Sequence, residues 1–243
     1  MTHSTVPVIF DLDGTLVDPA GGISDGIAAA LTELGIAVPG KARLDAMIGP
    51  KLSHSLVDIA GVPPEQLEEA IRIYRAHYLS TGIARSRLYP GIRALLDSFV
   101  DAGRPIAVAT QKPEHLARIV LEHHGIAALF HVIRGSAADE AGAATGPSGK
   151  AGIVAAALAE LRTPYAVMVG DRAQDVAGAA ANGLDCIGVA WGFALDGELR
   201  EAGAVEIVHS TSALHDTISK LDSVRAAALM TEALNEVPTD GNV

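Results

Sequence analysis

Five short apolar runs alternate with helical segments along most of this chain. The runs span residues 6–10, 105–110, 131–135, 165–170 and 185–190. Between them, apolar residues recur three and four positions apart, as in Ile92, Leu95 and Phe99, which is typical of an amphipathic helix. Apolar strands that alternate with such helices favour a parallel sheet with helices on both faces. The sequence therefore predicts an α/β fold that binds ligands at the carboxyl ends of its strands.

A long segment after the first apolar run interrupts this alternation. Between about residues 18 and 86 the sequence shows only helical patterning. One stripe of this pattern consists of Leu67, Ile71, Tyr74 and Tyr78. Because the segment is too long for a simple crossover, we expect a helical insertion after the first strand. The predicted division is a core of residues 1–17 and 86–222, an inserted helical domain of 18–85, and a partly disordered tail of 223–243.

Net charge limits the partners that we expect. The chain has 18 Lys and Arg residues against 29 Asp and Glu residues, a formal net charge of −11. A chain this acidic repels phosphate backbones and anionic lipid, so we expect it to bind neither nucleic acid nor membrane. An anionic substrate would need a local cation.

One cysteine, Cys186, excludes an intramolecular disulfide. We see neither a signal peptide nor an apolar run of about twenty residues, so we expect a cytoplasmic protein.

The first apolar run leads directly into two carboxylates, Asp11 and Asp13, followed by Gly14. Asp-Gly between apolar runs is a hairpin signal, but the residues that follow lack the alternation of a return strand. We therefore interpret the segment as the functional end of a strand. Side chains two positions apart on a strand point the same way, so we expect Asp11 and Asp13 to project together. Two carboxylates this close repel each other unless a cation or a shared proton relieves them.

A second acidic pair, Asp171 and Asp175, follows the run at 165–170. On a helix these residues would face the same way, and like charges four positions apart are destabilising. The alternative is a helix-opening Asp171 favoured by the helix dipole, with Asp175 solvated. Two strand-end acidic pairs in one parallel sheet indicate a hard divalent cation, and carboxylate oxygens suit Mg²⁺. Residues 191–194 follow the last run, and we expect their backbone near the same edge.

Two further segments suit an anion. Thr110, Gln111 and Lys112 precede a helix that we expect to open at Pro113. A hydroxyl, free N–H groups and a helix dipole favour phosphate, although a simple helix cap is the alternative. Lys150 lies at another helix start, where the dipole disfavours a cation unless it neutralises a bound anion.

The segment before Lys150 reads GPSGK, which suggests a phosphate-binding loop of the Walker A type. We reject this interpretation. Ala144 stands where the first glycine should be, and Ala151 replaces the Ser or Thr that should follow the lysine.

Together these motifs resemble the haloacid dehalogenase-like hydrolase superfamily, specifically the phosphoglycolate phosphatase-like branch with a helical cap. The resemblance covers residues 6 to about 209. Asp11 to Thr15 resemble motif I, Thr110 motif II, Lys150 motif III, and the segment from Asp171 to Asp175 motif IV. The family core implies a Rossmann-like parallel sheet of five strands with the first strand at its centre. The resemblance also implies that the inserted helices form the cap.

The resemblance implies a mechanism. Asp11 attacks phosphorus and forms an aspartyl-phosphate. Asp13 protonates the leaving oxygen and then activates the water that releases phosphate. Mg²⁺ is held by Asp11, the backbone carbonyl of Asp13 and Asp171, with Asp175 supporting the site. Halide displacement needs no proton at its leaving group, so Asp13 favours phosphoester hydrolysis over dehalogenation.

The resemblance also implies which residues surround the phosphate, namely Gly14, Thr110, Gln111 and Lys150. One departure is Gln174, which stands where this branch often has histidine. The leading hypothesis is a Mg²⁺-dependent phosphatase for a small soluble phosphomonoester, with phosphoglycolate and nucleoside monophosphates as main candidates. A phosphosugar mutase and a non-catalytic phosphate-binding regulator are the alternatives.

Cap side chains would select the leaving group, because the cap closes over the site and excludes water. The cationic candidates within the insertion are Arg43, Lys51 and Arg85. For each of them, a solvated surface charge is the alternative role. Nothing in the sequence decides between a monomer and a homodimer.

Overall fold

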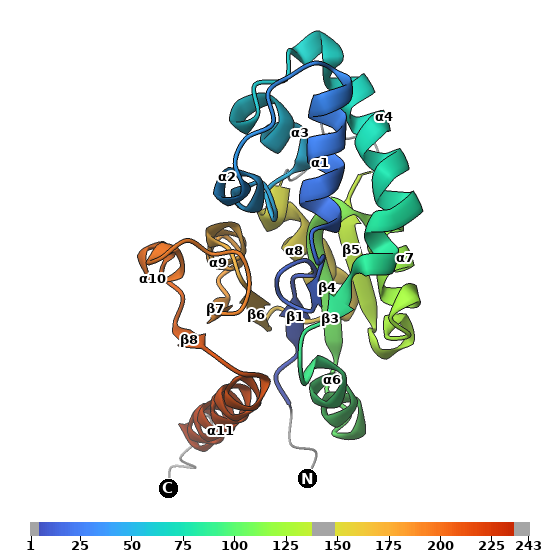
Figure 1. Ribbon diagram of the computed structural model, residues 1–243. Helices are drawn as coiled ribbons and strands as arrows, with labels where there is room; N and C mark the ends of the chain where they lie inside the picture. Colours follow the sequence, from blue (N-terminus) through green and yellow to red (C-terminus); the bar gives the residue numbers. More distant parts are fainter. Residues whose placement is uncertain (1–4, 138–148, 236–243) are drawn as a thin grey trace, which may run out of the picture.

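A six-stranded parallel sheet forms the centre of the protein (Figure 1). The computed structural model describes residues 5–137 and 149–235, with side chains described to residue 224. The strand order is β5-β4-β1-β6-β7-β8, with the first strand inside the sheet, as predicted. The strands are β1 (Val8–Phe10), β4 (Ile106–Pro113), β5 (Val132–Ser136), β6 (Val167–Gly170), β7 (Asp185–Val189) and β8 (Glu206–Val208).

The predicted α/β fold and parallel sheet are confirmed, but the predicted number of five strands is wrong. The additional strand, β8, pairs with β7 at the edge of the sheet. It has three residues and begins with the exposed Glu206, while Val208 is buried. A strand this short, with a charged residue at one end, gives no continuous apolar run that the sequence could reveal.

Helices cover both faces of the sheet, as predicted. The helices on one face are α6 (Ile92–Asp101), α7 (Glu114–His123) and α11 (Thr211–Asn235), and those on the other are α8 (Gly149–Leu161), α9 (Ala173–Ala180) and α10 (Glu198–Ala202). Alternate strand residues serve the two faces: Val8 and Phe10 pack in one apolar cluster and Ile9 in the other. A short 3₁₀ helix, Ala127–Leu129, precedes β5.

The helical insertion lies between two short strands, β2 (Val17–Asp18) and β3 (Arg87–Leu88), which pair antiparallel. Its helices are α1 (Gly22–Glu33), α2 (Lys41–Ala46), α3 (Leu52–His54), α4 (Leu67–His77) and α5 (Ile83–Arg85), with π-helical turns at Ser55–Ile59 and Tyr78–Gly82 and a 3₁₀ turn at Pro64–Gln66. In Figure 1 the insertion lies at the top, over the carboxyl ends of the central strands. Its division from the core as a separate domain stays a prediction.

Most of the stripe predicted on the insertion is buried in the structure. Ile71 and Tyr74 on α4 are buried, Leu67 is half-buried, and α4 packs against α1. The tail expected from residue 223 begins within α11, which continues to Asn235, and residues 236–243 lie outside the described residues. Among the helices described, none combines the length and the apolar character that crossing a membrane requires.

Candidate active site

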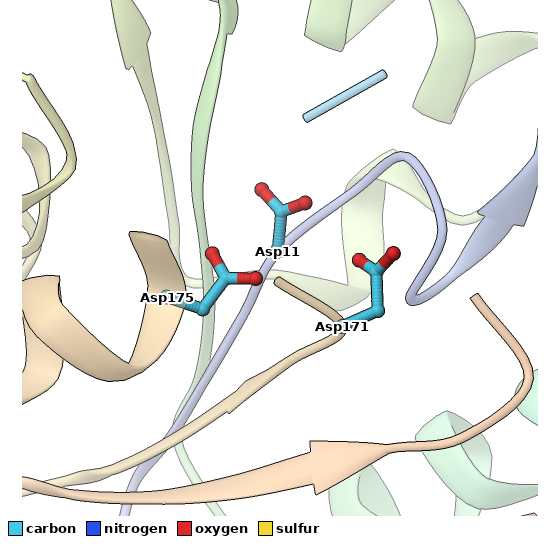
Figure 2. Close-up of side chains that lie close together, drawn as sticks. All are labelled: Asp11, Asp171 and Asp175. Carbon is cyan, nitrogen blue, oxygen red and sulfur yellow. The ribbon is translucent and has the colours of Figure 1, made fainter. Parts of the chain in front are cut away.

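Three buried carboxylates lie at the carboxyl ends of neighbouring strands (Figure 2). Asp11 follows β1, Asp171 follows β6, and Asp175 lies in the first turn of α9. Because β1 and β6 pair in register, the Asp11 backbone N–H donates to the Val169 carbonyl at 2.9 Å, and both strands end at one edge. One carboxylate oxygen of each aspartate lies within 4.8 Å of those of the other two. The two predicted acidic motifs therefore meet.

Lys150 joins two of these carboxylates. Its Nζ lies 2.5 Å from Oδ1 of Asp11 and 2.6 Å from Oδ1 of Asp175, and its side chain is only 4% exposed. Burial alone would lower the Lys150 pKa, but the two carboxylates outweigh that effect and raise it. The ammonium at the start of α8 is therefore stabilised by carboxylates, which offset its unfavourable position at a helix N-terminus.

The cluster has more carboxylates than the one lysine can neutralise. Three ionised aspartates and one lysine would leave two negative charges in a buried site. Burial and the nearby carboxylates raise the pKa of Asp171 well above its ordinary value. Burial also raises the pKa of Asp175, to about 6, although Lys150 opposes this. Two residual charges on buried oxygen ligands suit a divalent cation such as Mg²⁺, so these residues fit the metal that the resemblance implies.

Asp171 is anchored by residues that the sequence did not single out as ligands. The Thr15 hydroxyl donates to Asp171 Oδ1 at 3.0 Å, and the Phe193 backbone N–H donates to Oδ2 at 2.8 Å. A Cβ atom on either Gly14 or Gly192 would clash with the Asp171 carboxylate. The expectation that residues 191–194 bring their backbone to this edge is therefore confirmed, and glycine is required there by the close approach.

Asp13 has a different partner. Strand β1 ends at Phe10, and the chain turns through Gly14, whose φ is 89°, so extended geometry does not continue to Asp13. The Asp13 Oδ2 atom lies 2.8 Å from Lys112 Nζ, in a pair that is buried on both sides. Burial raises the Asp13 pKa, and Lys112 partly counters the shift. Asp11 and Asp13 still line one cavity.

The predicted phosphate residues of β4 divide between two environments. Thr110 is buried and lines the cavity. Gln111 donates through Nε2 to the Gly49 carbonyl at 3.0 Å, so its amide contacts the insertion rather than the acidic cluster. The helix expected to open at Pro113 begins one residue later, because Pro113 has an extended backbone and pairs with Ser136 of β5.

Arg172 is a further residue that the sequence analysis missed. Its Nε donates to Glu198 Oε1 at 2.9 Å. Its Nη1 donates to the carbonyls of Ala46, the last residue of α2, and of Ile48, in the loop that follows. Together Arg172 and Gln111 attach that loop to the core. An arginine inside an acidic motif needs partners, but no local spacing points to Glu198, and the partners in the insertion lie more than a hundred residues away.

The cationic candidates of the insertion do not converge on the cavity. Arg43 is exposed and donates to the Ile59 carbonyl at 2.5 Å. Arg85 is exposed and pairs with Asp25 at 2.5 Å. Lys51 is half-buried at the start of α3. The insertion instead gives the cavity an apolar wall, whose residues are Ile23, Met47, Ile48, Pro50, Leu52 and Tyr74.

Fold and site together define an α/β enzyme whose reactive groups lie at the ends of central strands. The sequence matches the family model described as haloacid dehalogenase-like hydrolase over residues 8–189. The chain therefore belongs to the haloacid dehalogenase-like hydrolase family, and the resemblance identified from the motifs is confirmed. As a member of this family, it is an enzyme of the hydrolase class.

Several characterised proteins are similar to it. The chain is 40% identical over 208 residues to the tyrosine-protein kinase PtkA of Mycobacterium tuberculosis, covering 84% of this chain and 69% of that protein. It is 38% identical over 195 residues to a 5'-nucleotidase of Pseudomonas aeruginosa, covering 79% and 86%. It is 30% identical over 211 residues to a plasmid phosphoglycolate phosphatase of Cupriavidus necator, covering 85% and 90%. The crystal structure of a predicted phosphatase from Clostridium acetobutylicum superposes with a TM-score of 0.82 at 37% identity, covering 89% and 100%.

Proposed function

We propose that this protein is a Mg²⁺-dependent phosphatase that hydrolyses a small phosphomonoester through an aspartyl-phosphate on Asp11. The observation that carries the proposal is one cavity with two buried carboxylates, each held by its own lysine. Lys150 holds Asp11, and Lys112 holds Asp13. The pKa of Asp13 is raised by burial, which suits an acid, so the two carboxylates can take different roles.

The residues support a two-step reaction. In the first step an Asp11 oxygen forms a bond to phosphorus while the bond to the leaving oxygen breaks, and Asp13 gives its proton to that oxygen. In the second step Asp13 takes a proton from water, whose oxygen attacks phosphorus and restores the Asp11 carboxylate. In this proposal Lys150 and the Thr110 hydroxyl offset charge on the phosphoryl oxygens.

Asp11 and Asp171 would hold the metal with the Asp13 backbone carbonyl, and Asp175 would support the site. When bound, Mg²⁺ supplies positive charge that offsets the negative charge of the phosphate ester. The protein's own contribution is to orient these oxygens. Asp171 is fixed by Thr15 and Phe193, and Asp175 accepts from the Arg172 backbone N–H at 3.0 Å as well as from Lys150.

The cavity lining favours an uncharged leaving group. Its wall from the insertion is apolar and includes the ring of Tyr74. A glycolate leaving group carries a carboxylate, and burying it requires a cation. Arg43 and Arg85 contact other partners, and Lys112, which lines the cavity, is paired with Asp13. A nucleoside or another neutral alcohol needs no such cation. We therefore propose nucleoside monophosphates ahead of phosphoglycolate, in agreement with the name of the Pseudomonas aeruginosa relative.

The similarity to a protein named a tyrosine kinase adds a second candidate. An aspartyl-phosphate can pass its phosphoryl group to a hydroxyl group instead of to water. A phosphosugar mutase would use the same step on a sugar. Both transferases differ from a phosphatase in one measurable respect, since the phosphate appears on an acceptor and not in solution.

The test measures phosphate release from nucleoside monophosphates, phosphoglycolate and sugar phosphates with Mg²⁺ or with EDTA. Parallel reactions supply ATP with a tyrosine peptide, or a sugar bisphosphate activator, and measure transfer. We expect release that requires Mg²⁺ and is lost in Asp11→Asn, with circular dichroism showing that the variant is folded. Release that persists in Asp11→Asn would refute the aspartyl-phosphate. Phosphoryl transfer without phosphate release would show a transferase and not a phosphatase. Absence of both transfer and release would support the non-catalytic phosphate-binding regulator.

A further inference from the structure

Lys112 is a buried cation that the proposed chemistry uses only as the ion-pair partner of Asp13. It lies in β4, and its side chain is 6% exposed. Two of the groups near its Nζ differ in kind. One is Asp13 Oδ2 at 2.8 Å, and the other is the face of the Tyr78 ring, with 4.5 Å between Nζ and the ring centroid. An ammonium over an aromatic face is attracted by the ring quadrupole, and the attraction is larger when water is excluded.

Tyr78 belongs to the helical insertion, so the Lys112 ammonium connects the insertion to Asp13. Tyr78 is 1% exposed and is the first residue of the π-helical turn that follows α4. It stacks on Tyr74 with 5.7 Å between centroids and 9° between planes. Tyr74 itself lines the cavity. A continuous contact therefore runs from Asp13 through Lys112 and Tyr78 to the wall of the cavity.

The other oxygen of Asp13 is in an unusual position. Oδ1 is buried and has no hydrogen-bond partner within residues 5–137 and 149–224. A buried carboxylate oxygen without a partner is costly, and such atoms in native proteins call for an explanation. Lys112 holds Oδ2 and thereby fixes which oxygen stays free. A free, oriented oxygen is what a proton donor to the leaving group requires.

We propose that Lys112 is a positioning residue that orients Asp13 for proton transfer, and that Tyr78 holds the Lys112 ammonium in place from the insertion. The inference rests on the proposed function, because it assigns Asp13 as the proton donor. Tyr78 acts on Asp13 only through Lys112. Packing of the insertion against the core is thereby linked to proton delivery in the cavity.

The test compares two esters in variants at both positions. Para-nitrophenyl phosphate has an acidic leaving group that departs with little help from a proton donor. The alkoxide of a simple alkyl phosphate is strongly basic, so its leaving oxygen must be protonated as it departs. For each ester, kcat/KM reports on the steps up to and including departure of the leaving group, and it does not include hydrolysis of the aspartyl-phosphate. For Lys112→Met we expect a loss of about 100-fold on the alkyl ester and less than about 10-fold on the nitrophenyl ester. Inhibition by inorganic phosphate should stay within about 3-fold of wild type, since binding is not changed.

Tyr78 supplies a matched pair of variants. Tyr78→Phe keeps the ring face and removes only the hydroxyl, which also interacts with Lys112, so it should shift the leaving-group preference little. Tyr78→Leu removes the ring face as well and should shift the preference further, in the direction of Lys112→Met. Equal losses on the two esters in Lys112→Met would overturn the proposal in favour of a merely structural lysine. A large weakening of phosphate inhibition would overturn it in favour of a phosphate ligand. If Lys112→Met does not fold, the comparison of Tyr78→Leu with Tyr78→Phe decides. The quantity compared is kcat/KM on the nitrophenyl ester divided by kcat/KM on the alkyl ester, and equal values in the two variants would overturn the proposal.

This test is separate from that of the proposed function. Wild-type turnover that depends on Mg²⁺ and Asp11 establishes the phosphatase whether or not Lys112 orients Asp13. Only the leaving-group preference of the variants reports on Lys112. Asp13→Asn provides the reference, because it should show the largest preference for the acidic leaving group.

Discussion

Lys150 Nζ lies 2.5 Å from Asp11 Oδ1, although the two residues are 139 positions apart in the sequence. The contact is buried on both sides, with 4% and 7% of the side chains exposed. Removing one partner of a buried ion pair leaves the other charge unpaired, which is more costly than losing a surface pair. The position of the proposed nucleophile therefore depends on a helix that begins after β5.

Replacing Lys150 should damage both stability and activity. For Lys150→Met we expect a loss of about 3–5 kcal/mol in the unfolding free energy of the metal-free protein, because Asp11 and Asp175 lose the buried ammonium that pairs with them. We expect kcat to fall about 100- to 1,000-fold, because a positive group near the phosphoryl oxygens is lost. Urea denaturation and phosphate release measure the two effects.

Lys41→Met is the matched control for that variant. Lys41 pairs with Asp45 at 2.5 Å, but its side chain is 86% exposed. Exposed pairs contribute about 0–1 kcal/mol, so this variant should be nearly as stable and active as wild type. A similar loss in both variants would show that burial does not decide the effect.

The metal-free protein should lose stability as the pH rises. Burial and neighbouring carboxylates raise the pKa of Asp171 well above its ordinary value, and burial raises that of Asp175 to about 6. An acid with a raised pKa binds more protons when folded, so its contribution to stability is present below its unfolded pKa and lost as the pH rises through the folded pKa. With EDTA, we expect a higher urea midpoint at pH 5.5 than at pH 8.

Mg²⁺ should add more stability at pH 8 than at pH 5.5, because protons compete with the metal for the same oxygens. The control is Asp171→Asn, which is neutral at every pH. It should stabilise the metal-free protein at pH 8 and remove most of the Mg²⁺ effect. A pH dependence in this variant as steep as in wild type would show that other groups cause it.

Gly192 should not tolerate a side chain, because a Cβ atom there would clash with the Asp171 carboxylate. For Gly192→Ala we expect destabilisation of about 1–3 kcal/mol, typical of overpacking, and weaker Mg²⁺ binding. Gly40→Ala is the control, since a Cβ at Gly40 has nothing within 4 Å and its φ is −64°. Thermal unfolding and Mg²⁺ titration distinguish the two. Equal behaviour of both variants would contradict the close approach to Asp171.

Replacing Gln111 should lower kcat/KM for the ester and leave the binding of inorganic phosphate unchanged. Its amide donates to Gly49 in the insertion at 3.0 Å. We expect Gln111→Leu to lower kcat/KM for the ester about 3- to 10-fold, equivalent to one lost hydrogen bond, with inhibition by inorganic phosphate unchanged. Thr110→Val, which removes a hydroxyl from the cavity, should weaken phosphate inhibition. If Gln111→Leu weakens it as well, Gln111 contacts phosphate, as the sequence predicted.

Local pattern was sufficient to predict most of the sheet and the residues at its strand ends. Asp11 and Asp171 follow buried apolar strands, and their meeting is a consequence of parallel topology. The edge strand β8 escaped prediction because it is short and partly polar. Contacts between core and insertion escaped it for another reason. Gln111, Lys112 and Arg172 act through partners in the insertion or far along the chain, and no local spacing encodes such partners.

The short strands β2 and β3 have a consequence for how this protein could diversify. Val17 pairs with Leu88 and Asp18 with Arg87 in a separate two-stranded sheet, so the two ends of the insertion lie side by side. With both ends fixed side by side, the entropy of closing the intervening loop grows only slowly with its length. Helices there can be lengthened, exchanged or lost while the six strands keep their register. Natural selection can thus change which alcohol is recognised and leave the bond-breaking residues where they are.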